Sequence, residues 1–196
     1  MKRLAIFVSG NGTNMENILE HIRAGEIRAE AALVVSDNPQ AYALKRAEKF
    51  DVECLVVERK KFDSKEAFEA EIRRHLERKK IDYILLAGFM RILSPSFVKA
   101  YPNRILNIHP SFLPEFPGAH AIRDAFENKM KLLKSGTGVT VHFVNDKIDA
   151  GPPICQKRVP IKADDTLETL EKRIHEVEYA LYPEAIKLML EGKVRL

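Results

Sequence analysis

Two polar side chains, Asn107 and His109, end an apolar segment of the chain directly before Pro110. Residues two apart in a strand point to the same side, so the amide and the imidazole are expected to lie next to each other. Such a pair can donate hydrogen bonds to an oxyanion, and the imidazole can also carry a proton. Three prolines fall within residues 110–117 and exclude a helix there, which predicts a stiff loop with the pair at its base. We therefore take Asn107 and His109 as the candidate catalytic centre, although a histidine considered alone is more often a structural residue.

A glycine-rich segment at residues 9–14, with the sequence SGNGTN, is the second candidate site. Glycines allow the backbone to approach an anion, and the helix expected after them presents unpaired N–H groups and a positive dipole end. This composition predicts a phosphate site that uses Gly12, Thr13 and Asn14, and a tight strand-to-helix turn is the structural alternative. A dinucleotide fingerprint requires a third glycine where Met15 stands, so the segment does not indicate NAD binding.

Two further segments have the composition of ligand-binding loops. Residues 88–93 place a glycine beside large apolar side chains at the end of an apolar strand, which suits either one wall of a pocket for a flat ring or plain core packing. Residues 144–153 contain Asp146 and Asp149, and either carboxylate can be a partner for His109 or only a turn-forming residue. Chemistry spread over such distant segments requires a fold that brings strand ends together.

The order of apolar segments predicts that fold. Short, continuous apolar runs typical of buried strands cover residues 4–8, 31–35, 53–57, 82–87 and 104–108. Amphipathic helical patterns alternate with them at residues 14–24, 41–50, 64–80 and 94–101. The last part of the chain differs, with strands predicted at 137–145 and 154–161 and a helix at 166–191. We predict a single α/β domain over residues 1–196: a Rossmann-like, mostly parallel sheet with helices on both faces and an antiparallel C-terminal extension. Ligand sites in such sheets lie at the carboxyl ends of the strands, where the candidate segments fall.

Composition limits the choice of partners. The chain has 196 residues, 45% of them hydrophobic, and a net charge of +4 from 32 Lys and Arg against 28 Asp and Glu. No apolar run approaches the ~20 residues that span a bilayer, and the short apolar start reads as a strand, so we expect a cytoplasmic protein. Trp is absent and no basic stripe with aromatic residues occurs, which argues against a nucleic-acid partner. Cys54 and Cys155 are predicted to be buried thiols, and the histidines lack ligand spacing, so no metal is expected.

Several ordered blocks of the sequence resemble the folate-dependent glycinamide ribonucleotide formyltransferases, also called phosphoribosylglycinamide formyltransferases. The resemblance extends over essentially the whole chain, whereas the Asn107–His109 pattern alone is similar to the wider superfamily that uses 10-formyltetrahydrofolate. The blocks that carry the resemblance are SGNGTN at 9–14, LAGFMRILS at 86–94, NIHPS at 107–111 with Pro117 and Gly118, GVTVHFV at 138–144 and DAGP at 149–152.

The resemblance implies roles for individual residues. It implies a catalytic trio of Asn107, His109 and Asp149. It implies contacts to the ribonucleotide substrate, including its phosphate, from Gly12, Thr13, Asn14, Gly88, Pro110 and Glu178. It implies a folate site formed by Lys65, Phe89, Met90, Arg91, Ile92, Leu93, Asn107, Asp146 and Asp149. It divides the domain into a phosphate-binding half, residues 1–100, and a catalytic and folate-binding half, residues 101–196.

Two features depart from the family pattern. Lys65 stands where an arginine is expected to approach the folate tail, so the positive charge is kept but the planar guanidinium is lost. The segment 129–135 is longer than expected before the block at 138–144, and a surface loop can absorb the extra residues.

The implied chemistry is transfer of a formyl group between two nitrogens. The amine of glycinamide ribonucleotide attacks the formyl carbon of the co-substrate 10-formyltetrahydrofolate, and neither a metal nor a covalent enzyme intermediate is required. Asn107 and a protonated His109 would stabilise the tetrahedral intermediate, while Asp149 would assist by helping to move the proton. The alternatives are a formyltetrahydrofolate hydrolase, another formyltransferase of the superfamily such as one that acts on methionyl-tRNA, and a non-catalytic nucleotide-binding module. A monomer and a homodimer are both compatible with the sequence.

Overall fold

The computed structural model describes residues 1–194, and seven strands in this range form one sheet in the order β3-β2-β1-β4-β5-β6-β7. The pairs β1–β2, β1–β4 and β2–β3 are parallel, and β6–β7 is antiparallel. The predicted fold class, a mostly parallel α/β sheet with an antiparallel C-terminal extension, is confirmed. The chain divides into two compact units, Met1–Leu106 and Asn107–Leu196.

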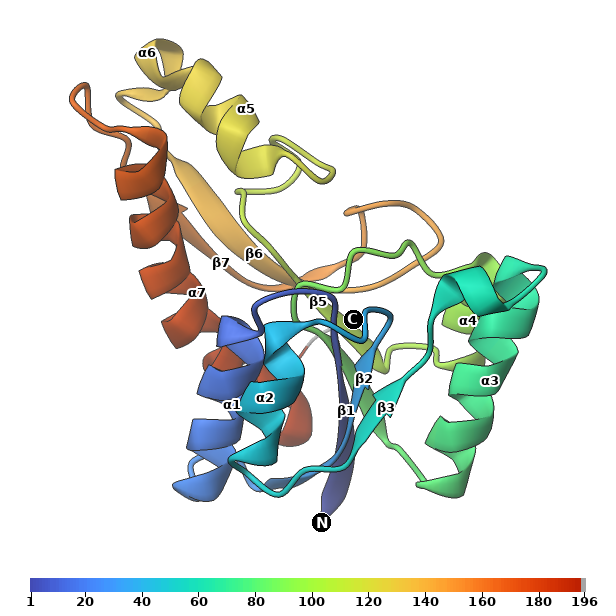
Figure 1. The fold of residues 1–196 in the computed structure, drawn as a ribbon. Coiled ribbons are helices and arrows are strands. Elements are labelled where there is room, and N and C mark those ends of the chain that lie inside the picture. The colour runs from blue at the N-terminus through green and yellow to red at the C-terminus, as the bar shows by residue number, and fades with distance from the viewer. Residues whose placement is uncertain (195–196) are drawn as a thin grey trace. The chain divides into compact units, whose positions relative to one another are not determined.

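The first unit is built on four strands that the apolar runs predicted. They are β1 (Lys2–Val8), β2 (Ala29–Ser36), β3 (Cys54–Val56) and β4 (Tyr83–Leu86). Every side chain from Leu4 to Val8 is fully buried, because helices cover the strands on both flanks. Figure 1 shows α1 (Thr13–Arg23) and α2 (Tyr42–Glu48) side by side on one flank, and α3 (Lys65–Arg78) and α4 (Pro95–Ala100) on the other. Strands buried on two faces need no polar alternation, which explains the continuous apolar sequence of β1, β2 and β4; β3 is the edge strand, and its Cys54 and Val56 are exposed.

Serine caps define the beginnings of α3 and α4. The hydroxyl of Ser64 accepts a hydrogen bond from the backbone N–H of Ala67, and Ser94 does the same for Phe97. Both bonds satisfy amide groups that have no partner inside the helix. Ser94 also donates its backbone N–H to the buried carboxylate of Glu69 at 2.7 Å, which ties α4 to α3. The predicted helices at 64–80 and 94–101 are confirmed to within two residues at each end.

The second unit contains the antiparallel extension. Strand β5 (Ile105–His109) ends in it, and β6 (Thr137–Phe143) pairs with β7 (Pro153–Val159). Helix α7 (Leu167–Leu190) packs along β6 and β7 (Figure 1) and continues through Pro183. It begins with a capping box in which Thr166 and Thr169 each bind the backbone of the other.

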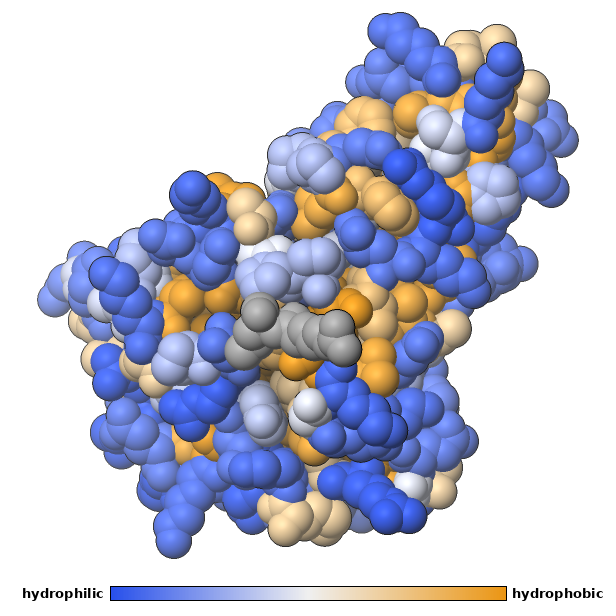
Figure 2. Space-filling view, turned by 180° about the vertical axis from the view of Figure 1, so that it is seen from behind, coloured by the Kyte–Doolittle hydropathy of each residue, from blue (hydrophilic) through white to orange (hydrophobic). Residues whose placement is uncertain are grey.

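Two details of the structure differ from the sequence predictions. Helices α5 (Ala121–Glu127) and α6 (Lys129–Leu132) fill a stretch for which no element was predicted. Figure 2 shows apolar side chains between hydrophilic ones in the region of these helices, and Met130 is 68% exposed. The prediction of two buried thiols was wrong, since Cys54 is exposed and Cys155 is half-buried. Both cysteines lie on the strands at the two ends of the sheet order, each paired on one side only.

No helix among residues 1–194 combines the length and the apolar character that crossing a bilayer requires.

Candidate active site

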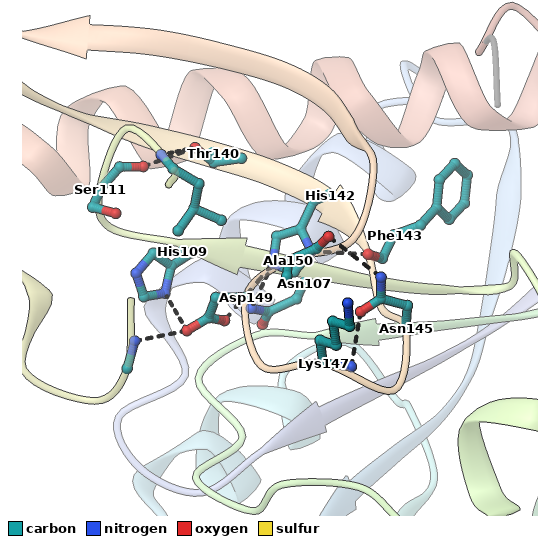
Figure 3. A network of polar contacts seen from close by, with 12 residues as sticks. Asn107, His109, Ser111, Thr140, His142, Phe143, Asn145, Lys147, Asp149 and Ala150 are labelled. Atoms are coloured by element: carbon teal, nitrogen blue, oxygen red, sulfur yellow. Dashed lines mark hydrogen bonds and ion pairs between the residues drawn. The ribbon is translucent and has the colours of Figure 1, made fainter. Parts of the chain in front are cut away.

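The polar side chains of two strands gather at one place in the second unit (Figure 3). Asn107 and His109 come from β5, and His109 is only 5% exposed. Thr140 and His142 come from β6, where they alternate with apolar core residues and are both buried. The two-residue period of a strand therefore places an amide, a hydroxyl and two imidazoles in one polar cluster. The pair in β5 was predicted from its two-residue spacing, whereas the pair in β6 was not predicted, although it has the same spacing.

The hydrogen bonds of His142 fix its tautomer. Its Nδ1 lies 2.9 Å from the carbonyl oxygen of Phe143, and its Nε2 lies 3.2 Å from Nδ2 of Asn107. A carbonyl oxygen only accepts, so Nδ1 carries the proton and Nε2 of the neutral ring accepts from the amide of Asn107. Burial lowers the pKa of His142, which keeps the ring neutral near pH 7. His142 thus orients the Asn107 amide and leaves the second hydrogen of Nδ2 available to another acceptor.

Asp149 reaches this cluster from the loop between β6 and β7 (Figure 3). Its Oδ2 is 3.5 Å from Nδ1 of His109, and its Oδ1 is 3.9 Å from Nε2 of His142. The same Oδ2 accepts a hydrogen bond of 2.8 Å from the backbone N–H of Gly118. Asp149 has φ 48°, a left-handed conformation that non-glycine residues seldom adopt and that turns its side chain inward here. The structure therefore brings together the three residues for which a catalytic role was predicted.

The loop is held close to the end of β6. A side chain at Gly151 would place its Cβ 1.7 Å from the carbonyl oxygen of Phe143, so only glycine fits. Asn145 bridges the loop by donating to Ala150 O at 3.3 Å and accepting from Lys147 N at 3.0 Å. The other carboxylate predicted here, Asp146, is exposed. Of the two candidate partners for His109, the structure brings only Asp149 within ion-pair distance.

The second ring nitrogen of His109 has a partner as well. Its Nε2 lies 2.9 Å from the carbonyl oxygen of Phe116, in the proline-rich loop that was predicted to be stiff. That loop is anchored to β6 because Thr140 Oγ1 donates to Ser111 O at 2.8 Å and accepts from Leu113 N at 3.1 Å. An acceptor oxygen therefore faces each ring nitrogen of His109.

Glu178 and Pro110 also belong to the second unit. Pro110 is half-buried directly after β5. Glu178 is buried in α7, and its Oε2 lies 2.7 Å from Nδ1 of His175. This hydrogen bond raises the pKa of His175.

In the first unit, the segment predicted to bind phosphate forms the junction between β1 and α1. Gly12 is the N-cap of α1 with φ 76°, and no side chain caps the helix there. A Cβ at Gly12 would lie 2.4 Å from Cβ of Ala43, so both the conformation and the packing require glycine. Thr13 and Asn14 are half-buried in the first turn of α1. The result is an uncapped helix N-terminus after a glycine turn, which is the geometry expected of an anion site.

The segment after β4 lies beside this junction. Ser9 N donates to Gly88 O at 3.1 Å, and Met90 N donates to Ser9 Oγ at 2.8 Å. Gly88 has φ 78°, a conformation that glycine adopts without strain. The two segments predicted to bind ligands in the first unit are therefore joined by direct hydrogen bonds.

The large side chains of the segment do not behave alike. Met90 is 74% exposed and Ile92 63% exposed, which is too much for core residues, whereas Leu93 is buried. Phe89 packs edge-on against Phe7 at 5.2 Å between ring centroids. The core-packing interpretation is thus wrong for Met90 and Ile92 and right for Leu93. Exposed apolar side chains on a hydrogen-bonded loop suit contact with a ligand.

Two charged residues complete the predicted folate set. Arg91 forms an ion pair of 2.7 Å with Asp37. Lys65 is the first residue of α3 and is half-buried after the Ser64 cap. No group of three or more His, Cys, Asp or Glu side chains within the described part of the chain could hold a metal ion.

The chemistry open to the second unit follows from these contacts. It offers an oriented amide donor, an imidazole with acceptors on both nitrogens, and a carboxylate able to accept a proton. These groups match the needs of acyl transfer through an oxyanion, in which donors must be fixed before charge develops.

Comparisons with known proteins agree with this chemistry. Residues 2–186 match the family model described as formyl transferase. The chain is 43% identical over 190 residues to the phosphoribosylglycinamide formyltransferase of Bacillus subtilis (strain 168), with 97% of this chain and 95% of that protein covered. It is 40% identical to the trifunctional purine biosynthetic protein adenosine-3 of Drosophila melanogaster, where it spans 97% of its own length and 14% of the relative. The crystal structure of glycinamide ribonucleotide transformylase 1 from Symbiobacterium toebii superposes with a TM-score of 0.94 at 42% identity, covering 100% of this chain and 91% of that one. The resemblance identified from the sequence is confirmed. The chain therefore belongs to the formyl transferase family, and within it to the phosphoribosylglycinamide formyltransferases.

Proposed function

We propose that this enzyme transfers the formyl group of 10-formyltetrahydrofolate to the amine of glycinamide ribonucleotide. The observation that carries the proposal is the convergence of Asn107, His109 and Asp149 in one cluster, with Asp149 Oδ2 at 3.5 Å from His109 Nδ1. The family membership supports the reaction class, and the proposal adds the donor, the acceptor and the residues that act.

Asn107 is proposed to stabilise the tetrahedral intermediate. The substrate amine attacks the formyl carbon, the carbonyl π bond opens, and negative charge develops on the formyl oxygen. One hydrogen of Asn107 Nδ2 is used by His142, so the other is oriented toward this oxygen without further ordering. A donor that is already oriented costs no reorganisation when the charge develops.

His109 is proposed to donate a hydrogen bond to the oxyanion, and Asp149 to transfer the proton from the attacking amine to the leaving nitrogen. The Nε2–H of His109, which now faces Phe116 O, donates to the oxyanion when the formyl oxygen takes the place of that carbonyl. Asp149 accepts the proton lost by the attacking amine and, through a water molecule, delivers it to the folate nitrogen as the C–N bond breaks. The intermediate then collapses to formylated product and tetrahydrofolate, and every proton is accounted for.

The binding roles are proposals that rest on the same resemblance. The ribonucleotide, with its phosphate, is assigned to Gly12, Thr13, Asn14, Gly88, Pro110 and Glu178. The folate is assigned to Lys65, Phe89, Met90, Arg91, Ile92, Leu93, Asn107, Asp146 and Asp149. The exposed side chains of Met90 and Ile92 support an apolar contact with the flat ring of folate. We further propose a cytoplasmic location and a monomer or homodimer that acts on small molecules without nucleic acid.

The test is to follow deformylation of the folate by its absorbance, with and without glycinamide ribonucleotide. Turnover that depends strictly on the ribonucleotide is the expected result. Turnover with water alone would identify a hydrolase, and turnover only with an aminoacylated tRNA would identify another formyltransferase. No turnover with any acceptor, together with nucleotide binding, would replace the proposal by a non-catalytic binding module. The Asn107→Ala variant is the control for background deformylation.

A further inference from the structure

Helix α2 holds the glycine-rich junction between β1 and α1 (residues 9–12) in place, and Arg46 makes most of the contacts. The guanidinium donates from Nε to the backbone oxygen of Asn11 at 2.9 Å and from Nη2 to the side-chain oxygen of Asn11 at 3.0 Å. Its Nη1 pairs with the carboxylate of Glu16 in the first turn of α1. The guanidinium also lies 4.9 Å above the ring of Tyr42, and the Arg46 side chain is only 18% exposed.

We propose that Arg46 is a positioning residue for the substrate phosphate: it holds the peptide between Asn11 and Gly12 in the orientation that anion binding needs. The inference rests on the proposed function, since it assigns the phosphate to this junction. Arg46 contacts the loop and not the reacting atoms, so its effect is expected on ribonucleotide affinity.

The geometry of the peptide bond carries the argument. In a trans peptide the C=O and the following N–H point in opposite directions. Because the Asn11 carbonyl points to Arg46, the N–H of Gly12 points away from it, on the side of the junction opposite α2. Gly12 has φ 76° and no side chain to restrain it, so the loop needs an outside constraint. Arg46 supplies that constraint at two atoms of the preceding residue.

The packing of α2 against the junction restrains it further. Ala43 N donates to Gly10 O at 3.1 Å, and the methyl group of Ala43 lies where a Cβ at Gly12 would be. Two consecutive turns of α2 therefore contact the junction, one through Ala43 and one through Arg46. The planar guanidinium of Arg46 reaches both the backbone oxygen and the side-chain oxygen of Asn11. The single ammonium group of a lysine cannot reproduce this geometry.

Electrostatics make a second, separable contribution. Glu16 is a negative charge one turn into α1, and a phosphate at the helix N-terminus would be repelled by it. Arg46 and Lys49 both pair with Glu16, and Lys49 Nζ lies 3.3 Å from Glu16 Oε1. Among residues 1–194, Glu16 is the only ion-pair partner of Lys49, whose side chain is 60% exposed, so this lysine tests the electrostatic contribution by itself. Lys49→Ala is therefore the matched control for Arg46→Ala.

The experiment measures steady-state kinetics of Arg46→Ala, Arg46→Lys and Lys49→Ala, with inorganic phosphate and ribose 5-phosphate as competitors. Loss of two hydrogen bonds that order the loop is expected to raise KM for the ribonucleotide about tenfold or more in Arg46→Ala. The inhibition constants of both competitors should rise by the same factor, while kcat and KM for the folate stay within about twofold. KM for the ribonucleotide in Arg46→Lys should lie between the values of wild type and Arg46→Ala. Lys49→Ala should have a KM close to that of wild type.

Several results would overturn the inference. An unchanged ribonucleotide KM in Arg46→Ala would do so, as would an equal effect of Lys49→Ala. Recovery of affinity in Arg46→Ala/Glu16→Gln would show that charge neutralisation, and not the hold on Asn11, is the role of Arg46. If Arg46→Ala does not fold, Asn11→Ala removes one of the two bonds and should give a smaller rise in the same constant; no rise would count against the proposal. Failure of the proposed function is distinguishable, because wild type would then show no ribonucleotide-dependent turnover while phosphate binding could still be measured by calorimetry.

Discussion

His142 is expected to act on catalysis only through Asn107, and a double-mutant cycle tests this dependence. Asn107→Ala removes an oxyanion donor, which typically costs ~3 kcal/mol of barrier and so lowers kcat roughly 150-fold. His142→Leu removes the acceptor that orients this donor across 3.2 Å. The loss is that of one neutral hydrogen bond, about 1 kcal/mol or roughly fivefold in kcat. In the double variant the amide is already gone, so the expected loss is that of Asn107→Ala alone.

The assay is kcat at saturating concentrations of both substrates, with the free energy of unfolding measured for each variant. His142→Gln is the matched control, because its amide oxygen can accept from Asn107 as Nε2 does. This variant should keep more activity than His142→Leu. If kcat of the double variant fell by roughly 800-fold, which is the product of the two single effects, the reasoning would be refuted. His142 would then contribute independently of Asn107.

Three further predictions concern the active-site loop and helix α7. Asp149→Asn keeps an oxygen for the Gly118 amide but loses the basic carboxylate, so kcat should fall by roughly 10²-fold or more with little change in KM for the ribonucleotide; a twofold effect on kcat would contradict the proton-transfer role. Gly151→Ala should destabilise the fold by about 1–3 kcal/mol in chemical denaturation, because its Cβ would overlap a carbonyl oxygen, and equal stability would show that the loop can move. His175 has a pKa raised by the hydrogen bond to a carboxylate on α7, so its stabilising effect is complete below about pH 6.5 and is lost as the pH rises through the folded-state pKa. The stability difference between wild type and His175→Gln should therefore shrink from pH 6 to pH 9, and a constant difference would exclude the linkage.

Much of the fold was predictable because burial on both faces leaves a clear mark in the sequence. The apolar runs at 4–8, 31–35 and 82–87 became largely buried strands, whereas the run at 53–57 became the edge strand β3, in which Cys54 and Val56 are exposed. The cap residues Ser64, Ser94 and Thr166 begin their helices where local hydrogen bonding predicts. Residues 121–132 were not assigned, because two helices of seven and four residues are too short to establish a helical period.

The candidate site was predictable only where its residues lie close together in the sequence. Asn107 and His109 share a strand end, so the pattern predicted their proximity. The approach of Asp149 depends on a left-handed backbone angle and on Gly151, neither of which a local pattern predicts. The role of His142 was not predicted, because it depends on a partner 35 residues away in the sequence. Tertiary hydrogen bonds of this kind leave no local pattern in the sequence.

The alternation along β6 has a consequence for how the sequence of this enzyme can change in length. Thr140 and His142 face the polar cluster, while Val139 and Val141, which alternate with them, are fully buried in the core. One residue inserted into β6 ahead of Thr140 would exchange the two sets, placing polar groups in the core and removing the acceptor for Asn107 at the same time. Insertions and deletions are therefore expected to accumulate before β6, where short helices and exposed lysines tolerate them, and to be eliminated by selection within the strand.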